Sequence, residues 1–188
     1  MRLALIAAVA VLALAGCSRL VEKSVEASVG EHAAEPGKEW SMQVLGDDAA
    51  RVILVKGPDG RTAAARVTKG VSTLIDDTEA LGLIGESQAA LAAADADGAP
   101  TERVAISAPG FSLKVAGDDE AGGTDGKGRV AIMASGVSIN VDGDDAGGEG
   151  RGLVRIAGVN DRAAAEFIDG VDELSPEVKA QMREKLGL

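Results

Sequence analysis

Hydrophobic and polar residues alternate with period two over much of the chain, a pattern typical of strands that bury one face. The first such stretch begins at Trp40, and two further apolar runs follow at 51–56 and 62–68. Gly-Pro-Asp-Gly at 57–60 separates these two runs and favours a tight turn. Residues 40–68 are therefore predicted to form a three-stranded antiparallel meander.

Residues 101–158 contain an internal repeat. The segment 103–119 recurs as 129–145, with a shorter echo at 40–48. Each full copy reads as two strands joined by a tight turn, with Gly-Asp-Asp and a glycine-rich loop at the other end. Repeated antiparallel hairpins are predicted. A short β-solenoid is the alternative, because repeats of this length are also typical of stacked coils.

The repeat concentrates its apolar side chains on one face of the predicted sheet. At period two this face carries Val104, Ile106, Phe111, Leu113, Val115, Val130, Ile132, Val137, Ile139, Val141, Val154 and Ile156. The opposite face carries Ser112, Lys114, Ser138, Asn140 and Arg155. An apolar sheet face needs a cover, and the helices predicted below are the candidates.

A central helix is predicted at 72–94, where apolar residues from Leu74 to Leu91 can line one face. Gly82 and Gly85 each cost such a helix about 1 kcal/mol relative to Ala. We therefore expect either a break at these glycines or an element that packs closely against them.

Two further helices are predicted in the C-terminal segment 161–187. Asp161 is expected to cap the first helix, and Ser175 followed by Pro176 marks the start of the second. These elements together predict an α+β fold, in which helices cover an antiparallel meander of repeated hairpins, in one domain over residues 40–188.

A different pattern precedes this domain. Arg2 is followed by an uninterrupted apolar run from Leu3 to Leu14. The run is too short to span a bilayer core, which takes about 20 residues. A basic start, a short apolar run and small residues are typical of a secretory signal peptide. Residues 1–16 are predicted to be this signal, and residues 17–39 to be a lipidated N-terminus and flexible tether.

The sequence Leu14-Ala15-Gly16-Cys17 resembles the lipobox of bacterial lipoproteins. The resemblance implies that Cys17, the only cysteine, becomes the first mature residue and carries a diacylglycerol, with a third acyl chain such as palmitate on its amine. At about 0.8 kcal/mol per buried methylene, two or three acyl chains anchor a protein stably. Ser18 follows in place of Asp, which in this family favours the outer membrane, facing the periplasm.

Charge and composition narrow the expected partners. The formal net charge of −11 disfavours nucleic acid and anionic lipid surfaces. Trp40, Phe111 and Phe167 are the only aromatic residues, which argues against sugar or single-strand sites built on stacked rings. His32, the only histidine, is interpreted as a solvated linker residue. The expected partners are the membrane, through the lipid anchor, and another envelope protein, with no nucleic acid.

Acidic residues cluster in the two glycine-rich loops of the repeat. The candidate metal ligands are Asp118, Asp119, Asp125, Asp142, Asp144 and Asp145. Oxygen ligands on such loops suit calcium, the one cofactor considered. Solvated turns whose charge keeps sheet edges apart are the favoured interpretation, because neither loop fits a calcium-loop template.

Signals for catalysis are weaker. The sequence has no Gly-x-Ser-x-Gly elbow, zinc signature or phosphate-binding loop, and its paired carboxylates lie in loops that lack an apolar pocket. The sequence therefore predicts an envelope lipoprotein with a binding or structural role. A calcium-binding lipoprotein is the first alternative, and an envelope hydrolase is the second.

Overall fold

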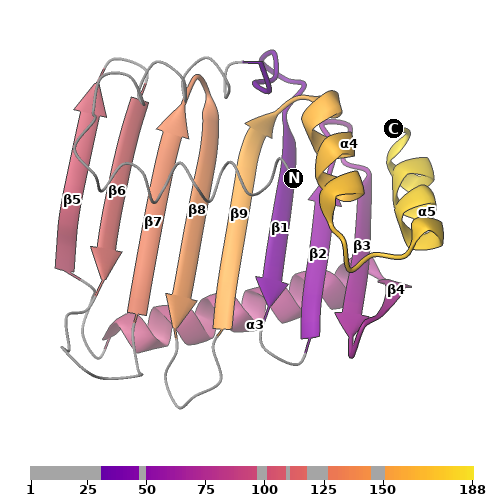
Figure 1. Ribbon diagram of the computed structural model, residues 1–188, viewed down its shortest axis with the longest axis horizontal. Coiled ribbons are helices and arrows are strands. Elements are labelled where there is room, and N and C mark those ends of the chain that lie inside the picture. The colour runs from indigo at the N-terminus through magenta and orange to yellow at the C-terminus, as the bar shows by residue number, and fades with distance from the viewer. Residues whose placement is uncertain (1–30, 47–49, 97–100, 109–110, 118–126, 145–150) are drawn as a thin grey trace.

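The computed structural model describes residues 31–46, 50–96, 101–108, 111–117, 127–144 and 151–188. Nine antiparallel strands form one open sheet in the order β4-β3-β2-β1-β9-β8-β7-β6-β5 (Figure 1). The strands are Trp40–Gly46 (β1), Ala50–Lys56 (β2), Thr62–Thr68 (β3), Val71–Ile75 (β4), Thr101–Ala108 (β5), Phe111–Gly117 (β6), Lys127–Ala134 (β7), Val137–Asp144 (β8) and Arg151–Val159 (β9).

The predicted α+β fold is confirmed. The first three strands form the expected meander, and both copies of the repeat form antiparallel hairpins. The alternative of a β-solenoid is wrong, because the hairpins lie side by side in one sheet and are not stacked as coils (Figure 1).

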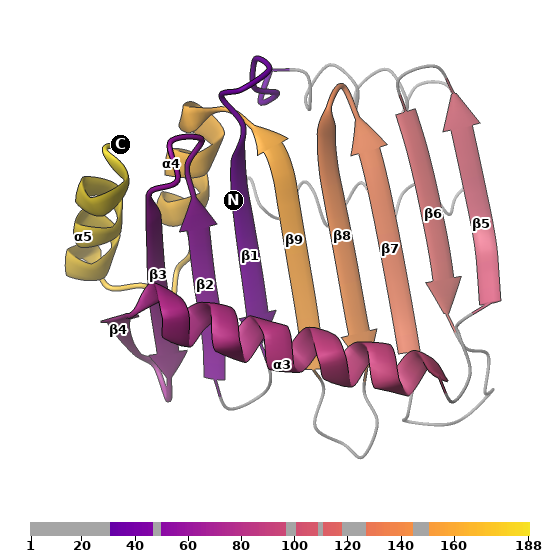
Figure 2. The same cartoon turned by 180° about the vertical axis from the view of Figure 1, so that it is seen from behind.

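The chain builds the sheet from the middle outward and then from the far edge inward. Strands β1 to β4 reach one edge, where the helix α3 (Asp77–Ala96) carries the chain across one face to the opposite edge (Figure 2). Its 20 residues span about 30 Å, or roughly six strand spacings of about 4.8 Å. Strands β5 to β9 then return, and β9 pairs with β1 to join the two halves.

The turn between β7 and β8 follows directly from its sequence. Ser135 and Gly136 have φ values of 49° and 85°. A two-residue hairpin turn of this kind needs positive φ at both positions, and glycine adopts it at low cost. The corresponding turn of the first copy, at 109–110, lies outside the described residues.

The central helix starts later than predicted. Residues 72–75 belong to the strand β4, which pairs with β3 from Thr68↔Val71 to Ala64↔Ile75. The side chain of Asp76 then accepts a hydrogen bond from the backbone N–H of Thr78 at 2.8 Å. This cap stabilises the first turn of α3 and separates strand from helix.

The expectation for the two helical glycines is also wrong. Helix α3 is continuous through Gly82 and Gly85, and a Cβ added at either would meet nothing within 4 Å. Both glycines are exposed. They therefore neither break the helix nor admit a close neighbour.

Two hydrophobic cores lie on opposite faces of the sheet. On one face, the C-terminal helices α4 (Asp161–Gly170) and α5 (Pro176–Leu186) pack over β1 to β3 (Figure 1). Helix α3 lies across the other face (Figure 2). Its residues Ala80 and Ile84 belong to one buried cluster with Val52, Leu54 and Leu153.

The predicted cover of the repeat is therefore only partly right. Ile139 and Ile156 belong to the apolar face of the repeat and pack in the core beneath the C-terminal helices. Helix α3 lies on the opposite face, together with Asn140 and Arg155. It does not cover the apolar face as predicted.

The C-terminal helices are close to prediction. Asn160, and not Asp161, caps α4, since its side chain accepts a hydrogen bond from Ala163 N at 2.9 Å. Ser175 caps α5 as predicted, with Pro176 at its first position. The three apolar residues that α5 buries are Val178, Met182 and Leu186.

The folded part of the chain begins before Trp40. Ala34 N donates a hydrogen bond to Gly158 O at 2.9 Å, and Asn160 N donates to His32 O at 2.8 Å. His32 is half-buried and does not lie in a solvated linker. Residues 32–34, which precede the predicted domain start at residue 40, are therefore held by hydrogen bonds to the end of β9.

Candidate functional site

Two of the predicted metal ligands fall on described residues. Asp142 and Asp144 both belong to β8 and do not lie in a loop. The other four, and the lipidation residue, lie outside the described residues: Asp118, Asp119, Asp125, Asp145 and Cys17. Within the described part of the chain, no three His, Cys, Asp or Glu residues come close enough together to hold a metal ion.

Asp142 lies in a cluster with two arginines from neighbouring strands. Register places Arg129 of β7 directly opposite it, and its Nε donates to Asp142 Oδ1 at 2.6 Å. Arg155 of β9 donates through Nη2 to the other carboxylate oxygen. Asp142 is buried, with 6% of its surface exposed, whereas the two guanidinium side chains stay 44% and 40% exposed.

This geometry gives Asp142 a structural partner for each carboxylate oxygen. Charge-assisted hydrogen bonds are about twice as strong as neutral ones, and a buried carboxylate needs them to offset its desolvation. The charge of Asp142 is therefore balanced without a metal ion. Calcium would have to displace two guanidinium groups to reach it.

Next to this cluster, toward β1, lie two buried side-chain atoms that have no hydrogen-bond partner. Gln43 and Arg155 are paired residues of β1 and β9, and both Gln43 Oε1 and Arg155 Nε are buried. Asn140 of β8 lies opposite Arg155 on its other side. The middle strands thus carry a strip of hydrogen-bonding side chains on the face of α3.

Sequence reasoning missed this cluster for a specific reason. Asp142 is predicted from the sequence to lie in the second glycine-rich loop together with Asp144 and Asp145, although period two continues from Ser138 through Asn140 to Asp142. That continuation places it on the polar face. The signal was present, but the identity of its arginine partners depends on strand register.

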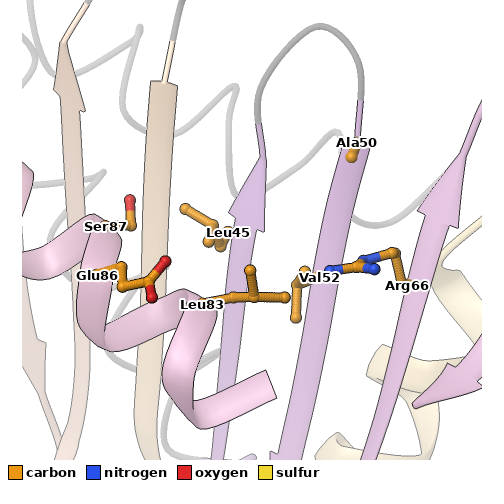
Figure 3. Close-up of a pocket in the computed structure, with 7 residues that line it drawn as sticks. All are labelled: Leu45, Ala50, Val52, Arg66, Leu83, Glu86 and Ser87. Carbon is orange, nitrogen blue, oxygen red and sulfur yellow. The ribbon is translucent and has the colours of Figure 1, made fainter. Parts of the chain in front are cut away.

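A second candidate site is a pocket of about 260 Å³ between α3 and the sheet (Figure 3). Its lining residues are Leu45, Ala50, Val52, Arg66, Leu83, Glu86 and Ser87. Leucine and valine side chains lie in the middle, between Ser87 at one end and Arg66 at the other (Figure 3).

The polar residues of this pocket differ in their partners. Arg66 Nη1 forms an ion pair with Glu79 Oε1 at 3.0 Å. Ser87 is only 5% exposed, and its hydroxyl oxygen has no hydrogen-bond partner. The pocket can therefore surround a small group with mixed polarity, but Ser87 has no neighbouring histidine to activate it as a nucleophile.

No protein-family model matches the chain, and no curated protein matches it in sequence. Across the described residues, none of the helices combines the length and apolar character needed to span a membrane.

Proposed function

We propose that this protein is a lipid-anchored protein of the bacterial cell envelope with a non-catalytic binding or structural role. The observation that carries the proposal is the sequence Leu14-Ala15-Gly16-Cys17 after an apolar run that begins at Leu3. These residues combine the order of a lipobox with a signal peptide of ordinary length. Cys17 is also the only cysteine in the chain.

The position of the folded domain is compatible with this anchor. The first described residue is Glu31, so the chain between Cys17 and Glu31 reaches at most about 50 Å when fully extended. A net charge of −11 disfavours contact with anionic lipid headgroups. We infer that the acyl chains, and not the domain surface, hold the protein at the membrane, with the outer membrane as the proposed location.

The binding role is supported by the polar face of the sheet. Arg129, Arg155 and Asn140 lie on neighbouring strands of this face, and Met133 on the same side is 57% exposed. Methionine and arginine are enriched at protein interfaces relative to the rest of the surface. The proposed partner is therefore another envelope protein. No described residue favours the calcium alternative, since Asp142 is engaged by arginines.

The experiment that tests the anchor is metabolic labelling with an alkyne fatty acid in a Gram-negative host. The wild-type protein should incorporate the label and remain in the membrane fraction after a high-salt wash. Cys17→Ala should lose the label and leave that fraction, whereas the neighbouring Ser18→Ala should keep both properties. A Cys17→Ala protein that still carries the label would disprove the proposal.

A further inference from the structure

The pocket between α3 and the sheet has walls from both layers. Leu45, Val52 and Arg66 lie in one row across β1, β2 and β3, since the register pairs Leu45 with Val52 and Val52 with Arg66. Helix α3 adds lining residues from within about one turn, namely Leu83, Glu86 and Ser87. The cavity of about 260 Å³ is therefore formed by paired strands on one side and by a single helix on the other (Figure 3).

Ser87 is the unusual residue of this helix face. Ala80, Ile84 and Ser87 follow the spacing of one face of α3, and the first two lie in its hydrophobic core. Ser87 is only 5% exposed, yet among the described residues its hydroxyl has no hydrogen-bond partner. Native proteins rarely leave a buried hydroxyl unsatisfied, because its lost contacts with water are then not replaced. The Ser87 hydroxyl is thus available to a molecule in the pocket.

The pocket carries opposite charges at its two ends. The carboxylate of Glu86 lies near Ser87 at one end, and the guanidinium group of Arg66 extends toward Val52 at the other (Figure 3). Of the ion pairs between described residues, none involves Glu86. Arg66 has one, through Nη1 to Glu79 at 3.0 Å, and a guanidinium group offers several further N–H donors. Both ends can therefore bind a further charge.

This arrangement favours a zwitterion whose two charges are separated by an apolar body. Leucine and valine side chains lie between the two ends of the pocket (Figure 3). Leu45 and Arg66 are two strand spacings apart, or about 10 Å between their backbones. A free amino acid carries both charges on one carbon atom and cannot reach both ends.

Length and volume then favour a dipeptide. An extended dipeptide spans about 7 Å, and the side chains of Glu86 and Arg66 can cover the remaining distance. The cavity of about 260 Å³ is smaller than the roughly 300–1,000 Å³ of pockets for drug-sized molecules. Much longer peptides therefore do not fit inside it.

We propose that this pocket binds a dipeptide with small apolar side chains. The carboxylate of the dipeptide pairs with Arg66. Its ammonium group pairs with Glu86 and donates a hydrogen bond to the Ser87 hydroxyl. Its apolar side chains pack between Leu83 and Val52. This ligand is additional to the envelope-protein partner proposed above, and its binding requires no lipid anchor.

Isothermal titration calorimetry of the whole chain with alanyl-leucine tests the proposal. We expect saturable binding of a single dipeptide per chain. N-acetyl-alanyl-leucine lacks the ammonium charge and alanyl-leucinamide lacks the carboxylate, so each should bind at least about tenfold more weakly. Free leucine should be weakened by a similar factor, because it cannot reach both charged ends.

Variants of the charged residues show which end binds which group. Glu86→Gln should weaken alanyl-leucine about tenfold but leave the affinity for N-acetyl-alanyl-leucine unchanged, because that peptide has no ammonium group to lose. Arg66→Gln should likewise weaken alanyl-leucine and leave the affinity for alanyl-leucinamide unchanged. Glu79→Gln is the matched control, since it removes a negative charge from the same helix outside the pocket lining and should not weaken binding.

Ser87→Ala separates the ligand contact from a structural role. It should weaken alanyl-leucine about fivefold without lowering the melting temperature, because the hydroxyl has no partner among the described residues. The proposal is overturned if alanyl-leucine shows no saturable binding, if both blocked peptides bind as tightly as alanyl-leucine, or if Glu86→Gln and Arg66→Gln keep the wild-type affinity. None of these outcomes bears on the lipidation of Cys17.

Discussion

Asp77 joins three elements of the fold through one side chain. It begins α3, and its carboxylate accepts hydrogen bonds from the hydroxyl of Thr62 on β3 and from Lys185 Nζ of α5, the latter at 2.9 Å. Partial burial raises the pKa of Asp77, but the hydrogen bonds from Thr62 and Lys185 and the positive charge of Lys185 together lower it below its usual value. The ionised form of Asp77 therefore stabilises the folded state.

This arrangement predicts a pH-dependent effect of Asp77→Asn. Because the pKa is lower in the folded state, the stabilisation is fully present above the unfolded value of about 3.9 and is lost as the pH falls through the folded value. Asp77→Asn should lower the free energy of unfolding by about 1 kcal/mol at neutral pH. The deficit should shrink below about pH 3.

Urea unfolding of the wild type and of Asp77→Asn, at neutral pH and below about pH 3, measures this deficit in the free energy of unfolding. Asp172→Asn, at an exposed position in the connection between α4 and α5, is the matched control and should change the free energy of unfolding by less than about 0.5 kcal/mol at either pH. A deficit of equal size at both pH values would show that the charge of Asp77 does not matter.

Asp142 shows how far sequence reasoning reaches at a single residue. Its acidic character and the repeat around it were evident from the sequence. Its environment was not, because Arg129 and Arg155 are brought to it by pairing between β7, β8 and β9. A residue interpreted as a calcium ligand is instead the buried anion of an arginine cluster.

At the level of elements, the end of β9 packs closely against the turn between β7 and β8. Gly158 has a φ of 84°, and a Cβ added to it would lie 2.1 Å from the carbonyl oxygen of Gly136. The obstacle is backbone and cannot rotate away. Gly60, in the turn between β2 and β3, has a similar φ of 85° but nothing within 4 Å of an added Cβ.

These two glycines separate backbone strain from steric clash. Gly60→Ala should cost about 1 kcal/mol, because only the left-handed backbone is strained. Gly158→Ala should cost clearly more, since the β7–β8 turn must also move. Thermal and urea unfolding measure the loss of stability in each variant. Equal losses would mean that the β7–β8 turn moves away from the added Cβ without a free-energy penalty.

The strand β4 shows why one element was assigned wrongly. Leu74 and Ile75 suit a helix face as well as a strand, and the five residues of β4 are too few to reveal a period. Pairing with β3 selects the strand, and the cap at Asp76 starts the helix afterwards. Whether a short apolar run of this kind forms a strand or a helix depends on the elements that pack against it.

At the level of the whole molecule, one sheet separates two hydrophobic cores. Met182 and Leu186 of α5 are fully buried on one face, and Ile84 of α3 is 3% exposed on the other. Layers on either side of a sheet lie about 10 Å from it. Side chains in the two cores therefore share no direct contacts.

This separation predicts additive effects. Ile84→Ala and Met182→Ala should each cost about 2–5 kcal/mol, and the double variant should match their sum within about 0.5 kcal/mol. The matched comparison is Met182→Ala with Leu186→Ala, neighbours on one helix face, which should depart from additivity. Urea unfolding of the wild type, the single variants and the double variants gives the free energies for both double-mutant cycles. Strong coupling between Ile84 and Met182 would show that the sheet transmits packing changes between its faces.

Local patterns in the sequence determined the strands other than β4, the turn between β7 and β8, the start of α5 and the N-terminal signature. Each depends on residues close together in the chain: period two, positive-φ turn residues, a serine cap before proline. Tertiary structure decided the pairing of β9 with β1, the placement of α3 on the polar face and the arginine partners of Asp142. Those features depend on which surfaces meet across long stretches of chain, and a face's polarity alone does not say which helix covers it.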